Sequence, residues 1–387
     1  MMVLNDVADF IVDCEHKTAP TQVEGIPSIR TPNIGKGRLI LDGVNRVSEE
    51  TYELWTKRAK PQGGDIIIAR EAPVGNVAII PDDLQVCLGQ RTVLVRPNKK
   101  IVDPDYLCYL LLGNELQGQI LVKTNGATVA HLNMKDIREL KLPSLPSIPV
   151  QKKIASIITA YDDLVENNKQ RIALLEQIAE DIYNEWFVRL RFPGYENLPV
   201  VDGIPEGWKR TKIGDIVTLN YGKALKEDDR VEGDFPVYGS SGVVGSNETS
   251  LIEGPVIIVG RKGNVGSIHW SDKNCWPIDT VYFIDKEQTS LFLYFNLQYQ
   301  PFINSDAAVP GLNRSQAYSL DIVMPESTVL EQFDKIVKPM HQQIINLQLY
   351  NKNLSQTRDL LLPRLISGKL SDEYLMKQKE QQLQLAI

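Results

Sequence analysis

Apolar residues recur at alternating steps of four and three positions in two long stretches of the chain, residues 154–186 and 333–365. A heptad pattern sustained over this length predicts two long coiled-coil helices. Each seam contains one asparagine, a residue that fixes helix register at a cost in stability. The predicted seam residues are Ile158, Tyr161, Val165, Asn168, Ile172 and Leu175 in the first helix, and Val337, Met340, Ile344, Leu347, Asn351 and Leu354 in the second.

These patterns place two helical regions at residues 149–190 and 327–370, which we expect to pack antiparallel. Ser147 or Pro149 is suited to open the first helix. Pro339 should kink or restart the second helix, because proline removes one hydrogen-bond donor from the helix interior.

Short β-branched runs before each helix predict strands, at residues 66–69, 92–95, 256–259 and 280–284. Short helices are expected around residues 106–112 and 291–297. Residues 191–208 are rich in proline and glycine and are interpreted as a linker, and residues 371–387 as a polar tail. The predicted fold class is α+β, with two α/β domains at 1–148 and 209–326 separated by the two antiparallel coiled-coil helices.

The two predicted domains repeat each other. Arg261 and Gly266 stand 191 positions after Arg70 and Gly75, in the similar stretches Gly64–Ile80 and Gly254–Trp270. Further matches align Thr92-Val93 with Thr280-Val281 at an offset of 188, and Leu132-Asn133 with Leu312-Asn313 at an offset of 180. Such a shrinking offset indicates duplication of a whole domain with loop deletions, and it suggests a pseudo-twofold symmetric molecule with its domains at the two ends of a helical rod.

The stretch "GPVIIVGRKGNVGSIHW" contains three glycines at a spacing of three, which at first suggests a phosphate-binding loop. Neither the Rossmann spacing nor the Gly-Lys-Ser/Thr ending of a P-loop is present. The alternating residues after Gly266 favour a β-hairpin with a glycine-containing turn.

Composition excludes several other classes. The formal net charge of −7 argues against a bulk positive field for nucleic acid, so any DNA contact must come from local basic loops. The four cysteines lack metal-binding spacing and are expected to be buried or free thiols in the cytoplasm. Four scattered histidines predict no metal site, and no apolar run is long enough to span a membrane. No Pro-Pro pair, nuclease motif or P-loop is present, so we expect no catalytic residues and no cofactor in this chain.

Several motifs, in their order along the chain, resemble the specificity (S) subunits of Type I restriction-modification systems. They are "EAPVGNVAII", "HLN", "PVQKKIASIITAYDDLVENN", "NEWFVRLRFPG", "PVYGSSGVVG", "VGRKGNVGSI", "GLN" and "LLPRLISGKL". The resemblance implies two target-recognition domains, two conserved helical regions and a bipartite double-stranded DNA target. It further implies two methyltransferase (M) subunits and restriction (R) subunits as partners, which would bind S-adenosylmethionine, ATP and Mg²⁺ for adenine-N6 methylation and restriction of phage DNA.

Basic, amide and hydroxyl side chains in the predicted loops are the candidate DNA contacts, because such groups position the phosphates or read base edges. They are Arg70, Gln90, Arg91, Lys123, Asn125, Tyr221, Lys223, Tyr238, Ser240, Ser241, Arg261, Lys262, Asn264 and Arg314. Alternatively, Arg261 pairs with an acidic residue on the domain surface. Two other functions stay open from the residues alone, a coiled-coil interaction scaffold and an unfamiliar stand-alone DNA-modifying enzyme.

Overall fold

The computed structural model describes residues 2–124, 131–302 and 311–367. The chain divides into two compact units, residues 1–168 with 349–387, and residues 169–348. Asn125 and the polar tail 371–387 lie outside the described residues. We call the first set unit 1 and the second unit 2, and describe each by itself.

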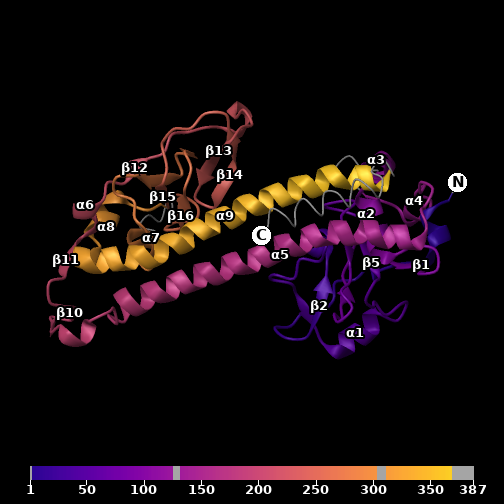
Figure 1. Cartoon of the computed structure of the whole chain (residues 1–387), viewed down its shortest axis with the longest axis horizontal. Helices are drawn as coiled ribbons and strands as arrows, with labels where there is room; N and C mark the ends of the chain where they lie inside the picture. Colours follow the sequence, from indigo (N-terminus) through magenta and orange to yellow (C-terminus); the bar gives the residue numbers. More distant parts are fainter. Residues whose placement is uncertain (1, 125–130, 303–310, 368–387) are drawn as a thin grey trace, which may run out of the picture. The chain divides into compact units, whose positions relative to one another are not determined.

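Two long helices dominate the secondary structure: α5 (Ile148–Tyr183), which continues into a π-helical turn (Asn184–Val188), and α9 (Ser327–Ile366) (Figure 1). Within unit 1, the Asn168 amide donates to Asn351 Oδ1 at 2.9 Å. Within unit 2, the rings of Trp186 and Phe333 lie 6.0 Å apart. Asp162, six residues before Asn168, accepts a hydrogen bond from Arg358, seven residues after Asn351, so within unit 1 the two helices run antiparallel.

The helix boundaries test two details of the sequence pattern. Ser147 precedes α5, and its carbonyl accepts the amides of Val150 and Gln151, so Ser147 opens the first helix. α9 passes through Pro339 without interruption, so the expected restart is wrong. The buried side chains of Val337 and Ile344 lie on either side of that proline, and their burial outweighs the loss of one backbone hydrogen bond.

The predicted seam residues face inward to different degrees. Fully or nearly buried are Ile158, Asn168, Val337, Ile344 and Leu347. Half-buried are Tyr161, Val165, Ile172, Leu175, Met340, Asn351 and Leu354. None of the twelve is exposed, as the heptad pattern requires.

Unit 1 contains a five-stranded sheet, in the order β1 (Ala8–Asp13), β8 (Thr92–Pro97), β5 (Ile66–Ala69), β6 (Val77–Ile79) and β3 (Lys36–Gly37). Only the β3–β6 pair is parallel among these strands. A second sheet has the order β4 (Arg46–Val47), β2 (Ile26–Ile29) and β7 (Cys87–Leu88). The shorter helices are α1 (Glu49–Trp55), α2 (Pro104–Leu112), α3 (Asn114–Lys123) and α4 (Met134–Arg138).

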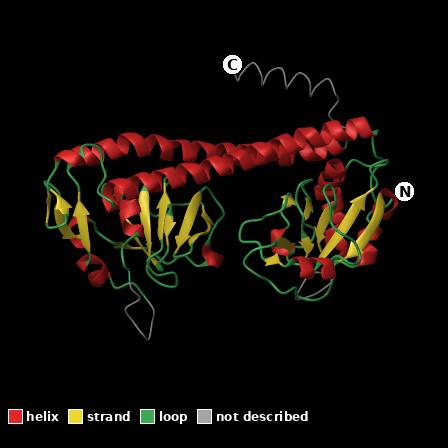
Figure 2. Ribbon diagram, turned by 90° about the horizontal axis from the view of Figure 1, so that it is seen from below, coloured by secondary structure: helices red, strands yellow, loops and turns green. Residues whose placement is uncertain are grey.

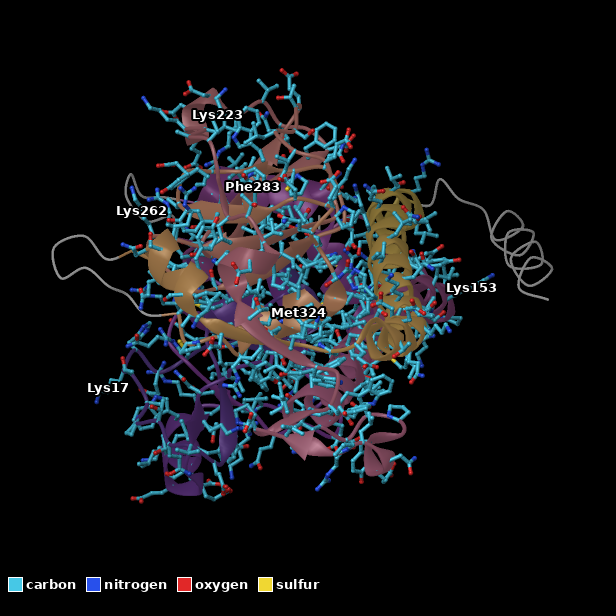
Figure 3. The ribbon with its side chains drawn as sticks, turned by 90° about the vertical axis from the view of Figure 1, so that its left-hand side faces the viewer. Lys17, Lys153, Lys223, Lys262, Phe283 and Met324 are labelled. Atoms are coloured by element: carbon cyan, nitrogen blue, oxygen red, sulfur yellow. The ribbon has the colours of Figure 1, made fainter. Side chains whose placement is uncertain are left out.

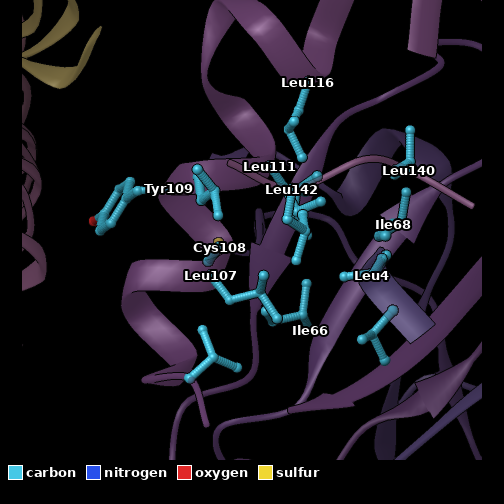
Figure 4. Packing of buried hydrophobic residues seen from close by; sticks show 14 of the residues in the cluster. Leu4, Ile66, Ile68, Leu107, Cys108, Tyr109, Leu111, Leu116, Leu140 and Leu142 are labelled. Atoms are coloured by element: carbon cyan, nitrogen blue, oxygen red, sulfur yellow. The ribbon is translucent and has the colours of Figure 1, made fainter. Parts of the chain in front are cut away.

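The core of unit 1 lies between the five-stranded sheet, α2 and the first turns of α5. Ile66 and Ile68 of β5 pack with Leu107 and Leu111 of α2 (Figure 4). Ile158 of α5 belongs to the same cluster and is completely buried. The strand run 66–69 has no polar face, because both sides of that strand are covered.

Unit 2 repeats this plan, with the sheet order β12 (Asn220–Tyr221), β18 (Val281–Ile284), β15 (Val256–Gly260) and β16 (Ile268–Ser271). Further strands are β14 (Gly242–Asn247), β13 (Phe235–Gly239) and β17 (Trp276–Pro277), then the pairs β11 (Lys209–Lys212) with β19 (Asp321–Met324) and β9 (Val200–Val201) with β10 (Ile204–Pro205). The helices are α6 (Ile213–Ile216), α7 (Leu291–Gln298) and α8 (Arg314–Ser319). Within each unit, the strands gather on one side of the long helices (Figure 2).

The proline- and glycine-rich segment 191–208 is more than a connection. Phe192 and Trp208 are buried, and their rings pack 5.0 Å apart in the core of unit 2. The two aromatic side chains bury a large apolar area, which anchors both ends of the segment.

The duplication is confirmed by pairing register, with one correction. Ile66 of β5 pairs with Val95 of β8, and Ile257 of β15 pairs with Ile284 of β18. The offset in the second strand is therefore 189 rather than 188, and Val93 corresponds to Tyr282. The alignment of Thr92-Val93 with Thr280-Val281 was therefore wrong by one residue. In a strand, a shift of one residue moves every side chain to the opposite face of the sheet.

Candidate nucleic-acid interface

The glycine stretch of unit 2 forms a tight loop between two antiparallel strands. β15 ends at Gly260 and β16 begins at Ile268, and the amide of Gly266 returns to the Gly260 carbonyl at 2.9 Å. Gly263 and Gly266 have φ angles of +76° and +77°, which only glycine adopts without strain. The predicted hairpin is thus confirmed, and its turn places Arg261 and Lys262 at the end of a buried strand.

The backbone of Arg261 is fixed on both sides. Its amide donates to the Thr280 carbonyl at 2.9 Å, and its carbonyl accepts the Leu312 amide at 2.7 Å. One guanidinium nitrogen, Nη2, donates to the Asp279 carbonyl oxygen. Within the described part of the chain, no carboxylate forms an ion pair with this arginine, so the alternative of an acidic partner finds no support there.

Two arginines converge on one tyrosine ring. The guanidinium carbons of Arg261 and Arg314 lie 5.4 and 5.1 Å from the ring centre of Tyr221, which is 54% exposed. Arg314 also lies 6.0 Å from the ring of Tyr318. Each arginine therefore makes a cation–π contact that restrains its guanidinium plane.

Tyr282 completes this aromatic group beneath the arginines. Its ring centre is 5.0 Å from that of Tyr221, and its hydroxyl donates to the Leu312 carbonyl at 3.1 Å. Burial and the neighbouring Tyr221 hydroxyl raise the pKa of Tyr282 to about 12, although Arg261 and Arg314 act in the opposite direction. Tyr282 consequently stays a neutral hydrogen-bond donor at physiological pH.

The other candidates of unit 2 fall into supporting and exposed groups. Ser240 is buried, accepts the Asn264 amide at 3.4 Å through Oγ, and so joins the β13–β14 hairpin to the glycine loop. Tyr238 is buried too, and its hydroxyl donates to the Trp270 carbonyl at 3.3 Å. The structure brings these two under the loop. Exposed or half-exposed are Ser241, Asn264, Lys223 and Lys262.

Lys223 and Lys262 lie on the side of unit 2 away from α9 (Figure 3). They come from different elements, because Lys223 follows β12 and Lys262 follows β15. Because β12 and β15 are both antiparallel to β18, these two lysines lie at the same end of the main sheet of this unit.

The corresponding arginine of unit 1 has a different environment. Arg70 is only 7% exposed. Its Nη1 pairs with Asp13 at 2.6 Å, and its Nε donates to the Leu132 carbonyl at 2.9 Å. In this position the side chain holds β1 to the loop after β5, and its guanidinium is largely used inside the domain.

His131 links Arg70 to the carboxylate of Glu71. Arg70 Nη2 lies 2.8 Å from His131 Nε2, and His131 Nδ1 lies 2.7 Å from Glu71. Because arginine can only donate, His131 Nε2 accepts and its Nδ1–H donates to the carboxylate. Arg91 pairs with the same Glu71 at 2.8 Å, and 58% of its side chain is exposed.

Arg91 also has a φ angle of +66°, an uncommon conformation for a residue other than glycine. Gln90 donates to the His16 carbonyl at 3.0 Å, and Lys123 pairs with Asp136 at 3.4 Å. The structure therefore groups Arg70, Arg91 and their acidic partners, while Lys123 is bound to a separate helix.

Sequence reasoning did not identify the residues that neutralise the first loop. Asp13 is 57 positions from Arg70 and belongs to a different strand, so no local pattern indicates the pair. The only signal for His131 was the change from "GLN" to "HLN" between the copies.

Three structural findings bear on other chemistry. In the described residues, no group of three or more potential metal ligands is present. None of the helices described is long and apolar enough to cross a membrane. All four cysteines are buried and free, and burial raises the pKa of Cys87 and of Cys275 to about 11.

Arginine, lysine and hydroxyl side chains, which this loop region presents, are the side-chain types that contact phosphates and base edges. A family model described as "Type I restriction modification DNA specificity domain" matches residues 2–177 and 205–349, which is most of the chain. The protein belongs to this family. It is a DNA specificity subunit of a Type I restriction-modification system, a non-catalytic subunit of a larger complex.

Curated relatives and a solved structure agree with this assignment. The chain is 26% identical over 367 residues to the Type I restriction enzyme MjaIX specificity subunit of Methanocaldococcus jannaschii, covering 86% of this chain and 83% of that protein. It is 24% identical over 399 residues to the HindI specificity subunit of Haemophilus influenzae, covering 79% and 86% of the two chains. The crystal structure of the S subunit from M. genitalium has a TM-score of 0.58 at 18% identity, over 94% of this chain and 95% of that one, and so shares the fold.

Proposed function

We propose that this subunit reads a bipartite DNA sequence, with one half-site bound by residues 1–148 and the other by residues 209–326. One observation carries the proposal: the two domains share a backbone frame but present different side chains on it. In both copies the carbonyl of the loop arginine accepts a backbone hydrogen bond, from the Leu132 amide at Arg70 and from the Leu312 amide at Arg261. Two domains that read different sequences require such a shared backbone with different surface side chains.

The electrostatics of the two frames differ accordingly. In unit 1, Asp13 and Glu71 neutralise Arg70 and Arg91. In unit 2, Arg261 and Arg314 have no ion pair among the residues described, and they stack on Tyr221. We propose that Arg91 is the more accessible cation of the first domain, while Arg70 positions the loop.

In each unit, the long helices leave large apolar side chains exposed, which a partner protein can cover. They are Leu164, Leu174, Ile178, Ile336, Leu349, Tyr350 and Leu360. We propose that two methyltransferase subunits dock here and that restriction subunits join them. Those partners would bind S-adenosylmethionine, ATP and Mg²⁺, and the complex would act in the cytoplasm.

Exchange of one domain tests the two-reader proposal. Residues 209–326 are replaced by the corresponding domain of a relative with a different target, and the methylated sites of the assembled complex are sequenced. One half of the motif should change and the other should persist. A motif that changes in both halves, or in neither, would contradict independent reading. Exchange of residues 1–148 in a second chain serves as the matched reciprocal control.

A further inference from the structure

We propose that Arg314 reads a guanine in the half-site bound by residues 209–326, with Tyr221 as the platform that orients its guanidinium. The inference rests on the proposed function, because it assumes that this domain contacts its own half-site. It goes further by assigning one base to one side chain and by giving Tyr221 a positioning role.

The two arginines beside Tyr221 are not equivalent. Arg261 donates to the Asp279 carbonyl through Nη2, and its Nε is buried without a partner in the described structure. Much of its hydrogen-bonding edge is therefore directed into the domain. Arg314 is exposed, and its guanidinium lies against the rings of Tyr221 and Tyr318. Among the described residues, this guanidinium forms no hydrogen bond or ion pair. Arg314 thus keeps its donors for a ligand.

The backbone of Arg314 is held in place from the adjacent residue. Asn313 caps α8, because its Oδ1 accepts the amides of Ser315 at 2.9 Å and Gln316 at 3.3 Å. The Leu312 amide donates to the Arg261 carbonyl, which joins the start of α8 to the glycine loop. The Cα atom of Arg314 is therefore fixed relative to Tyr221, and ring contacts restrain the far end of the side chain.

A restrained guanidinium plane suits the recognition of a base. Guanine presents O6 and N7 side by side in the major groove, and arginine binds both through two parallel N–H groups. This bidentate contact requires a defined plane, which stacking on an aromatic ring supplies. The same pair of N–H groups also fits a phosphate, so the test distinguishes the two ligands by whether binding depends on the base.

At the position equivalent to Arg314, the first domain has no hydrogen-bond donor in its side chain. Residue 134 is the counterpart of Arg314 at the offset of 180 that relates Leu132 to Leu312, and it is Met134, the first residue of α4. Met134 packs against the core of unit 1 and cannot donate to a base. The contact assigned to Arg314 therefore has no counterpart at the equivalent position of the first domain, and it contributes to a difference between the two half-sites.

The test compares Arg314→Lys with Arg314→Ala in the assembled methyltransferase complex. Binding is measured by selection from a DNA pool in which the second half-site is randomised. The wild-type complex should require guanine at one position. Arg314→Lys keeps the charge but removes the two parallel N–H groups of the guanidinium. The preference for guanine at that position should therefore fall by roughly 5- to 150-fold, while the rest of the motif persists. Arg314→Ala should lose the same preference and bind less tightly.

Two further variants separate the platform from the reader. Tyr221→Leu removes the ring and should relax the same position, whereas Tyr221→Phe retains the ring and should relax it much less. Arg210→Lys, on β11 of the same domain, is the matched control for loss of an arginine and should leave the motif unaltered. Recovery of DNA through the fixed first half-site reports within each selection that the complex has assembled.

Three results would overturn the inference. They are a wild-type second half-site without guanine, an Arg314→Lys complex that keeps its guanine preference, and equal weakening on all sequences, which indicates a phosphate contact. Failure of the two-reader proposal has a different signature. In that case exchange of residues 209–326 leaves the second half-site unchanged, whatever the Arg314 variants do.

Discussion

Removal of Asp162 should release the C-terminal half of α9 from unit 1. The carboxylate of Asp162 is 5% exposed and lies between three parts of the unit. It accepts the Tyr109 hydroxyl of α2 at 2.7 Å, and Arg358 of α9 donates to its other oxygen. Burial and this carboxylate both raise the pKa of Tyr109, so its hydroxyl stays protonated as a donor.

The expected magnitude follows from the exposure of the two charged partners. Breaking a buried ion pair from one side costs about 3–5 kcal/mol, because the remaining charge is left uncompensated. After Asp162→Ala, Arg358 is still 17% exposed and keeps Asp359 at 2.8 Å, so the loss should fall near the lower end, about 3 kcal/mol. Arg358→Ala strands a more deeply buried carboxylate and should cost at least as much.

The chain itself suggests the compensating replacement. An offset of 183 relates Asn168 to Asn351, and the same offset relates Asp162 to Ile345 and Leu175 to Arg358. A triple variant therefore combines Asp162→Ile and Arg358→Leu, the residues that the repeat has at these positions, with Tyr109→Phe, which removes the hydroxyl that Asp162 accepts. Because a well-packed apolar group can substitute for a buried ion pair, the triple variant should recover most of the lost stability.

Backbone hydrogen exchange is the suitable assay, because a chain with two compact units need not unfold in one step. Amides of residues 349–366 should exchange roughly two orders of magnitude faster in Asp162→Ala, and near the wild-type rate in the triple variant. Amides of β15 in unit 2 provide the internal control. Wild-type exchange in the single variant, or a triple variant as labile as the single one, would refute the assigned role of this cluster.

Two further predictions use the pKa shifts. Burial acts to raise the pKa of Asp272, but hydrogen bonds from His341 and Trp270 outweigh it and hold that pKa below the ordinary value of an aspartate. The resulting stability is present above the ordinary pKa and is lost as the pH falls through the lower folded-state pKa. His341→Ala should therefore move the acid unfolding of unit 2 to higher pH, and an unchanged midpoint would exclude this contact as its cause. With pKa values of about 11, the buried thiols of Cys87 and Cys275 should resist a thiol reagent at pH 8 and react only in denaturant. Rapid labelling of the native chain would show that these sites open.

The sequence predicted those features that depend on a local or periodic pattern. Heptad spacing located both long helices, since burying one apolar stripe requires that period. β-branched runs located β5, β8, β15 and β18, and glycine spacing located the turn after Gly260. Repetition of short motifs identified the duplicated domain, which the paired strand registers confirm.

Features that depend on distant residues were not predictable. The environment of Arg70 is set by Asp13 on another strand, whereas Arg261 has no such partner in the residues described. Both arginines have the same position in the repeat, so the sequence alone gave them the same role. Likewise, the heptad pattern marks Val337 and Ile344 as seam residues, but it does not show that their burial outweighs the hydrogen bond lost at Pro339.

Genome-wide detection of methylated adenine tests the two-reader proposal in cells that carry the assembled complex, compared with cells that lack only this subunit. We expect one motif with two specified ends and an unspecified gap between them, lost completely without the subunit. A single uninterrupted motif, or methylation that persists without this chain, would contradict it.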